Sequence, residues 1–163
     1  MKHTITVLVE NEFGVLTRVA GLFSARGYNI ESLSVAPTLD QTVSRMTLVT
    51  RGDEKVIEQI KKQLNKLIPV IKTEDISHMV HLEREMLLLK TKACDAVSAL
   101  VAEFRAKVVD SDSDDYTIIE LTGQADKLDD FLAKIADCGI IEMTRTGPVG
   151  MRRGSKGFVV ESV

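Results

Sequence analysis

Glu10 to Ala36 reads E-N-E-F-G-V-L-T-R-V-A-G-L-F-S-A-R-G-Y-N-I-E-S-L-S-V-A, and the fold of the chain follows from this stretch. Its apolar residues recur at the i, i+3, i+4, i+7 spacing of one helical face, as Leu16, Val19, Ala20 and Phe23. Gly27 stands where helices commonly end in a left-handed residue. The stretch therefore predicts one short amphipathic helix between two loops.

The sequence on either side of this helix predicts strands and a second helix. Alternating apolar residues predict a strand over residues 3–10. Further strands are predicted at residues 30–35, 43–48 and 70–76. A helix with acidic residues in its first turn and lysines later follows Gly52 and stops before Pro69. The resulting order is β-α-β-β-α-β.

The same order occurs a second time, in residues 82–144. When Gly52 is aligned with Gly123, the apolar positions of the following helices superpose without a gap: Ile57 on Leu128, Ile60 on Phe131 and Leu64 on Ile135. We therefore predict an α+β protein of two ferredoxin-like βαββαβ domains. The predicted boundaries are residues 1–76 for the first domain, 77–81 for a linker, 82–146 for the second domain and 147–163 for a flexible tail. Because two helices cover only one face of each sheet, oligomerisation is expected.

Composition excludes several classes of protein. The chain has 163 residues, 44% of them hydrophobic and 28% charged, which is typical of a globular protein. Its net charge of -3 and its 4% of aromatic residues argue against nucleic-acid binding. No apolar run is long enough to cross a membrane, and the N-terminus lacks the apolar core of a signal peptide. We therefore expect a cytoplasmic protein in which Cys94 and Cys138 are small buried apolar side chains and not a disulfide.

The two loops that flank the first helix form the candidate binding site. Backbone N–H groups after Asn11 and Gly14 could hold a small anion such as a carboxylate, helped by the helix dipole. The second loop offers a polar side chain at Asn29 beside an apolar one at Ile30. This combination suits a free amino acid. Taken separately, the first loop is better interpreted as an ordinary strand-to-helix turn and the second as a capped helix end.

Other polar clusters give weaker signals. The acidic run around Asp112 resembles the start of a calcium loop, but Asp115 replaces the required glycine and Leu121 the bidentate glutamate. His78 and His81 lie in the predicted linker without a third patterned ligand, so no metal site is expected. The basic, glycine-rich tail matches no phosphate-binding spacing. No nucleophile, base and orienting group can be assembled, so no catalytic residue is predicted.

The stretch from Glu10 to Ala36 closely resembles the small regulatory subunits of acetolactate synthase (acetohydroxyacid synthase). The resemblance continues through S-R-M-T at residues 44–47, G-D-E-K-V-I-E-Q-I at residues 52–60 and E-R-E at residues 83–85, and so covers nearly the whole chain. It implies that the first domain is an ACT domain and that the chain does no chemistry. This chain departs from the family pattern at two places. Ala106 stands where the family usually has glycine, and the segment of residues 91–104 is a few residues shorter than in the family.

The resemblance also implies a function. Two ACT domains of a homodimer would bind valine at their interface, with the loop before the first helix of one chain and the start of the second strand of the other. The matching effector-binding residues are Asn11, Gly14, Val15, Leu16, Asn29 and Ile30. The subunit would activate the catalytic subunit, which is expected to carry thiamine diphosphate, Mg²⁺ and FAD, and would confer feedback inhibition by valine in branched-chain amino-acid biosynthesis. This chain would carry no cofactor.

Two alternatives remain at this point. The first is a stand-alone ACT-type amino-acid sensor that acts on another target, against which the resemblance of the second domain argues. The second is a small enzyme on a ferredoxin-like fold, which the missing catalytic residues disfavour. Whether leucine or isoleucine is sensed as well as valine is open, since one methylene changes binding by only about 1–3 kcal/mol.

Overall fold

The computed structural model describes residues 1–160, and the chain divides into two compact units. The N-terminal unit comprises Met1–Leu82 together with the segment that begins at Val149, and the C-terminal unit comprises Glu83–Pro148. The structure has one sheet of four strands and one of five, and each unit carries two helices, so the predicted α+β architecture of two ferredoxin-like units is confirmed.

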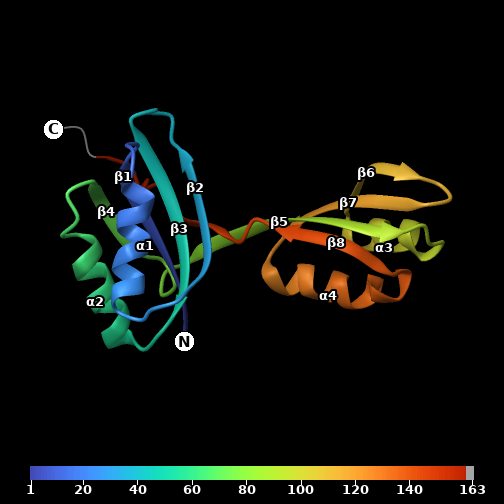
Figure 1. The fold of residues 1–163 in the computed structure, drawn as a ribbon, viewed down its shortest axis with the longest axis horizontal. Coiled ribbons are helices and arrows are strands. Elements are labelled where there is room, and N and C mark those ends of the chain that lie inside the picture. The colour runs from blue at the N-terminus through green and yellow to red at the C-terminus, as the bar shows by residue number, and fades with distance from the viewer. Residues whose placement is uncertain (161–163) are drawn as a thin grey trace. The chain divides into compact units, whose positions relative to one another are not determined.

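The N-terminal unit follows the predicted β-α-β-β-α-β order. Its strands lie in the order β2-β3-β1-β4, with α1 and α2 side by side over one face (Figure 1). The elements are β1 (Lys2–Glu10), α1 (Val15–Ala25), β2 (Ile30–Pro37), β3 (Val43–Arg51), α2 (Glu54–Leu64) and β4 (Val70–Asp75). Gly27 has φ +69°, as its predicted place after the helix end requires. Strands β2 and β4 are therefore the two edges of this sheet.

The core of this unit lies between the sheet and its helices. The alternate residues Ile5 and Val7 of β1 face it and stand opposite Leu48 and Met46 of β3. The helical stripes predicted from spacing also enter it: Val19, Phe23, Ile60 and Leu64 are all at most 1% exposed. The register of β1 is fixed by this packing, because a shift of one residue would turn its apolar side chains away from the helices.

The opposite face of the same sheet is partly covered by the C-terminal segment. Phe158 packs against Leu8 and Val43, and the Arg45 guanidinium lies 5.4 Å from the centre of its ring. Gly150 approaches the sheet so closely that a Cβ there would lie 2.5 Å from the Ile76 side chain. The expectation of a flexible tail is therefore wrong for residues 149–158. The sequence did not predict this packing, because the segment has no periodic apolar pattern and contains only one aromatic residue, Phe158.

The C-terminal unit repeats the arrangement. Its strand order is β6-β7-β5-β8, and a short strand, β9 (Val149–Arg152), pairs with β5. The elements are β5 (His81–Lys92), α3 (Ala96–Phe104), β6 (Lys107–Asp112), β7 (Tyr116–Gly123), α4 (Ala125–Ile135), the 3-10 turn η1 (Ala136–Cys138) and β8 (Ile140–Arg145). Leu128, Phe131 and Ile135, the positions that the internal repeat aligns with the first unit, are fully buried.

Cys94 and Cys138 form a disulfide in this unit, with their Cα atoms 5.5 Å apart. The expectation that both are merely buried apolar side chains is therefore wrong. The expectation rested on the reducing cytoplasm, which says nothing about whether two cysteines 44 residues apart are neighbours in space. They are neighbours because the strand order β7-β5-β8 brings the end of β5 next to the start of β8.

A charged network closes the other end of β8. Arg145 donates to Asp129 of α4 at 2.6 Å and forms an ion pair with Glu85 of β5, whose side chain is 5% exposed. The hydrogen bond with Glu85 raises the pKa of Arg145 above its ordinary value, and burial opposes this. The buried carboxylate of Glu85 is tolerated here because one nitrogen of the Arg145 guanidinium pairs with it, while the other nitrogen donates to Asp129.

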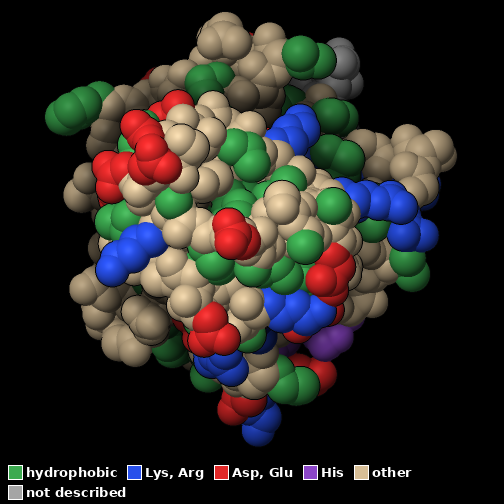
Figure 2. Space-filling view, turned by 90° about the vertical axis from the view of Figure 1, so that its right-hand side faces the viewer, with side chains coloured by type: hydrophobic (Ala, Val, Ile, Leu, Met, Phe, Trp, Pro, Cys, Tyr) green, Lys and Arg blue, Asp and Glu red, His purple; other side chains and the backbone are tan. Residues whose placement is uncertain are grey.

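The surface carries both signs of charge. Figure 2 shows acidic, basic and hydrophobic side chains interspersed on the face that it presents. No helix among residues 1–160 is long and apolar enough to cross a membrane.

Candidate functional site

The loop before α1 ends in a glycine with a left-handed backbone. Gly14 has φ +83° and is the N-cap residue of α1, where no described side chain caps the helix and no acidic residue lies in the first turn. A Cβ at this position would meet no heavy atom within 4 Å. The Val15 N–H makes a long hydrogen bond of 3.5 Å to the Glu12 carbonyl, but no side chain caps the helix entrance, so the next N–H groups and the positive dipole end can face an anion.

The second helix of the same unit provides the contrast. Its N-cap residue Asp53 accepts a hydrogen bond from the Val56 N–H at 2.8 Å, and Glu54 adds a carboxylate in the first turn. A carboxylate of the chain itself already occupies the anion position of α2. Of these two helices, only α1 presents an entrance at which an external carboxylate would find no competitor.

Asn11 is held by the turn between β2 and β3. Its side-chain Nδ2 donates to the Gln41 carbonyl at 2.8 Å, and its backbone N–H donates to the Thr42 carbonyl at 2.7 Å. Asp40 in turn accepts hydrogen bonds from the hydroxyl and the backbone N–H of Thr42 at 2.7 and 2.9 Å. The Thr42 hydroxyl, followed by its N–H, lowers the pKa of Asp40, so the carboxylate that braces this turn stays ionised.

Asn29 and Ile30 lie at the start of β2, beyond the other end of α1. The Asn29 carbonyl accepts a hydrogen bond from the hydroxyl of buried Thr50 at 2.7 Å. The pairing of β2 with β3 shifts register between Ile30 and Ser32, a local irregularity that can re-aim a side chain on an edge strand. The Asn29 side chain is exposed, while Ile30 is half-buried against the core.

The apolar residues named from the sequence differ in their surroundings. Val15 is 4% exposed and belongs to the core, so its side chain cannot line a binding site and only its backbone can. Leu16 is 43% exposed beside the loop. Leu16 and Ile30 therefore keep apolar surface that a ligand or a second chain can cover.

The structure brings Asn11, Gly14 and Leu16 together but separates them from Asn29 and Ile30. The two sets lie at opposite ends of α1, which has 11 residues and is therefore about 16 Å long. A single amino acid cannot touch both ends of such a helix. Within one chain, the predicted residues therefore fall into two separate groups.

The turn of residues 38–42 is a part of this site that sequence reasoning missed. Gln41 and Thr42 act through backbone carbonyls, which no residue pattern identifies. The one available signal was the run D-Q-T at residues 40–42, because Asp and Thr are typical of turns closed by their own side chains.

Comparison with known proteins identifies the family. The family described as "AHAS small subunit-like ACT domain" matches residues 5–72, and the family described as "Small subunit of acetolactate synthase" matches residues 84–154. The chain is 50% identical over 161 residues to the acetolactate synthase isozyme 3 small subunit of Escherichia coli K12, with 96% of this chain and 98% of that protein covered. The chain belongs to the family of acetolactate synthase small subunits.

Two further relatives support this assignment. A probable acetolactate synthase small subunit from Archaeoglobus fulgidus is 50% identical over 160 residues, which cover 96% of this chain and 99% of that protein. The crystal structure of the small subunit from Thermotoga maritima superposes with a TM-score of 0.89 at 36% identity and covers 96% of this chain and 99% of that one. The N-terminal unit is thus an ACT domain, and the chain is a regulatory subunit, not an enzyme in its own right.

Proposed function

We propose that this small subunit activates the catalytic subunit of acetolactate synthase and makes it sensitive to feedback inhibition by valine. The observation that carries the proposal is the open entrance of α1 at Gly14, which lies beside the polar group of Asn11 and the exposed apolar side chain of Leu16. These three features match the three parts of a branched amino acid: carboxylate, ammonium and aliphatic side chain.

The carboxylate of valine binds at the start of α1. The N–H groups of the first turn donate to it, and the dipole adds about 0.3–2 kcal/mol. Gly14 allows this approach because nothing lies within 4 Å of the place where a Cβ would stand. A side chain with a negative charge at that point would oppose the ligand carboxylate.

The ammonium group of valine needs oxygen acceptors. Asn11 uses its Nδ2 for the Gln41 carbonyl, which directs its Oδ1 away from that contact and leaves this atom as an acceptor. The exposed side chain of Asn29 supplies a second oxygen, and Ile30 and Leu16 cover the isopropyl group.

The two groups of residues are half-sites that belong to different chains of a homodimer. Strand β2, which begins at Ile30 directly after Asn29, is an edge of its sheet and can pair with the β2 of a second chain. Phe13 and Leu39, beside Asn11 and in the neighbouring turn, are fully exposed apolar side chains that such a partner could cover. A twofold dimer then completes two equivalent sites.

Regulation requires that valine favour one of two states of the complex with the catalytic subunit. Thiamine diphosphate, Mg²⁺ and FAD belong to that subunit in this proposal, and the complex works in the cytoplasm. The length of the match to acetolactate synthase small subunits, 96% of this chain, supports this target over that of a stand-alone ACT sensor.

Mixing two defective variants tests the shared site. Gly14→Asp damages the half-site at α1, and Asn29→Ala damages the half-site at β2, so each homodimer should lose valine binding in calorimetry. After the two proteins are unfolded together and refolded, mixed dimers hold one intact site and one doubly defective site. About one quarter of all sites should then bind valine normally.

Gly14→Asn is the matched control, because asparagine tolerates the left-handed backbone and adds no charge. It should keep most of the valine affinity that Gly14→Asp loses. If mixing restored no valine binding, the two half-sites would not be shared between chains, and the proposed shared site would be wrong. If Gly14→Asn lost as much valine affinity as Gly14→Asp, the loss would be due to backbone strain and not to the added charge.

A further inference from the structure

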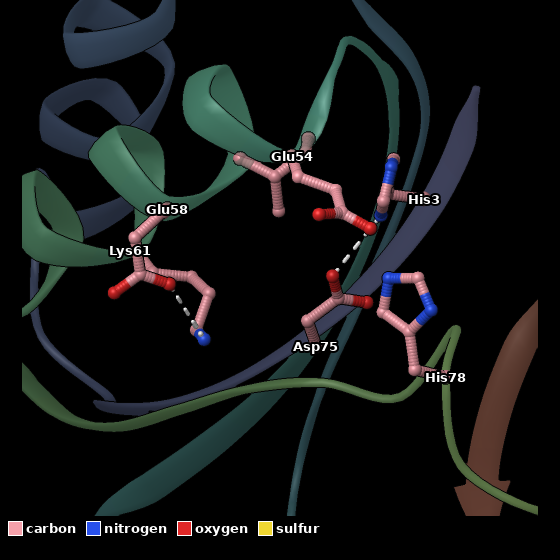
Figure 3. Close-up of a pocket in the computed structure, with 7 residues that line it drawn as sticks. His3, Glu54, Glu58, Lys61, Asp75 and His78 are labelled. Atoms are coloured by element: carbon pink, nitrogen blue, oxygen red, sulfur yellow. Dashed lines mark hydrogen bonds and ion pairs between the residues drawn. The ribbon is translucent and has the colours of Figure 1, made fainter.

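A cluster of metal-ligating side chains lies in the N-terminal unit beside a cavity that α2 helps to line. His3, Asp75 and His78 each offer a ligand atom, and these atoms all lie within 4.8 Å of one another. Figure 3 shows the His78 ring beside the Asp75 carboxylate with His3 next to them, and the Glu54 carboxylate pointing toward the same place. The residues come from β1, from the end of β4 and from the segment that follows β4.

The sheet register explains why His3 and Asp75 meet. Asp75 stands opposite Ile5 in the pairing of β1 with β4, and His3 is two residues before Ile5. Residues two apart on a strand share a face, so both side chains point to the helix-covered side. Their separation of 72 residues in the sequence hid this pair, and His78 alone gave no pattern.

The environment of His3 is unusual for a histidine without a bound ligand. The side chain is 1% exposed, its Nδ1 lies 3.0 Å from Asp75 Oδ2, and its buried Nε2 has no partner among the described residues. A buried polar atom without a partner costs about 1–3 kcal/mol and calls for an explanation such as a bound ion.

The charges around the cluster favour a cation. The cavity beside the cluster is lined by three carboxylates, those of Glu54, Glu58 and Asp75, and by one ammonium group. This ammonium group belongs to Lys61, which pairs with Glu58 at 3.3 Å. Burial alone would raise the pKa of Asp75, but hydrogen bonds from Ser77 and His3 outweigh it and hold the pKa below its ordinary value.

We propose that His3, Asp75 and His78 form a binding site for a divalent transition-metal ion of the Zn²⁺ type. Two imidazoles and one carboxylate are a ligand set that Zn²⁺ accepts, with water in the fourth position. Ligand atoms around tetrahedral zinc lie about 3.4 Å apart, so the cluster must contract by at most about 1.4 Å. His78 is exposed and lies outside the strands, so rotation of its side chain can provide this movement.

The ion ties the segment after β4 to β1. In the structure, that segment is held by Ser77, whose Oγ accepts from the Thr4 N–H at 2.8 Å and whose N–H donates to Asp75 at 2.9 Å. Coordination of His78 adds a bond from the same segment to the sheet. The site therefore links metal occupancy to the conformation of the residues that lead into β5.

The test uses the untagged full chain, freed of metal with a chelator and titrated with ZnCl₂ against a chromophoric zinc indicator. We expect one Zn²⁺ per chain, and His78→Ala should weaken binding at least about tenfold. Zn²⁺ should also raise the midpoint of thermal unfolding of the wild-type chain but not that of His78→Ala. Because His78 is exposed, this variant should fold.

His81→Ala is the matched control, since the chain has three histidines and His81 is the one outside the cluster. It should bind Zn²⁺ like the wild type. Absence of stoichiometric binding to the wild-type chain, unchanged binding by His78→Ala, or an equal loss in His81→Ala would each overturn the proposal.

Discussion

Gly14 and Arg105 both have a left-handed backbone, Gly14 at the N-terminus of α1 and Arg105 at the C-terminus of α3. Gly14 precedes α1 with φ +83°, and Arg105 follows α3 with φ 55° as the one non-glycine residue of positive φ in residues 1–160. The Ala106 N–H donates back to the Val101 carbonyl at 2.8 Å, which closes the helix end. An arginine held there has a steric cost that a glycine avoids.

Replacing Arg105 by glycine should therefore stabilise the C-terminal unit. The substitution relieves the left-handed backbone, and the exposed guanidinium makes no hydrogen bond or ion pair with the described residues that would be lost. We therefore expect the free energy of unfolding to rise by about 0.5–1 kcal/mol in urea denaturation. Arg26→Gly is the control at the end of α1, where φ is -109° and the arginine donates to Gln63. A decrease in stability for Arg105→Gly, equal to that of the control, would contradict the explanation.

The sequence pointed to single residues of the candidate site only where these have a special backbone or side chain. Gly14 and Asn29 stood out in the sequence because glycine and asparagine mark loops with particular conformations. The contact of Asn11 with the Gln41 carbonyl did not, because it depends on how the β2–β3 turn folds back toward β1. His3 was missed for the same reason, since only the register of β1 with β4 brings it to Asp75.

At the scale of elements, the disulfide joins the end of β5 to the turn before β8. It closes a loop of 44 residues that contains α3, β6, β7 and α4. A cross-link over a loop of this size restricts the unfolded chain and typically adds about 2–4 kcal/mol. The C-terminal unit should therefore depend on redox conditions more than the N-terminal unit does.

The paired substitution Cys94→Ala with Cys138→Ala measures this dependence. Without reductant, the variant should unfold at lower denaturant concentration than the wild type, with the loss confined to amide protons of residues 83–148 in hydrogen exchange. With reductant, the difference should shrink, and thiol titration of the wild type should rise from none to both cysteines. Two free thiols in the untreated protein would contradict the disulfide.

Elements were predicted well because apolar spacing and local signals agree. Val19 and Phe23 of the stripe predicted for α1 and the apolar pattern of β1 are buried as expected, whereas Leu16, the first residue of that stripe, is 43% exposed. The internal repeat correctly predicted the same order of elements in residues 82–144. The segment from Val149 escaped prediction because its contacts are specific and not periodic. Arg152 pairs with Glu74 at 2.9 Å, and Phe158 packs against Leu8 and Val43.

At the scale of the whole molecule, the edge strand β2 is the predicted dimer contact. Val35 in β2 is 43% exposed, and a lysine there would place a charge on an edge that must pair. We expect Val35→Lys to weaken dimerisation at least about tenfold in sedimentation velocity and to weaken valine binding with it. Ile71→Lys is the control, because Ile71 is 40% exposed on β4, the other edge of the same sheet.

Equal effects of the two lysines would remove the assignment of β2 as the dimer contact. If Val35→Lys gave a monomer that still bound valine fully, the half-sites would not be shared between chains. The sequence predicted the need for a partner from the uncovered sheet faces, but it could not say which edge or face receives one, because both edges of the sheet carry exposed apolar residues.

The most direct test of the account is acetolactate formation by the catalytic subunit, measured with and without this chain and with and without valine. The account predicts that the chain raises the rate, that valine lowers the raised rate, and that Gly14→Asp keeps the stimulation but loses the valine effect while Gly14→Asn keeps both. A catalytic subunit whose rate is unchanged by the chain and indifferent to valine in its presence would contradict the account.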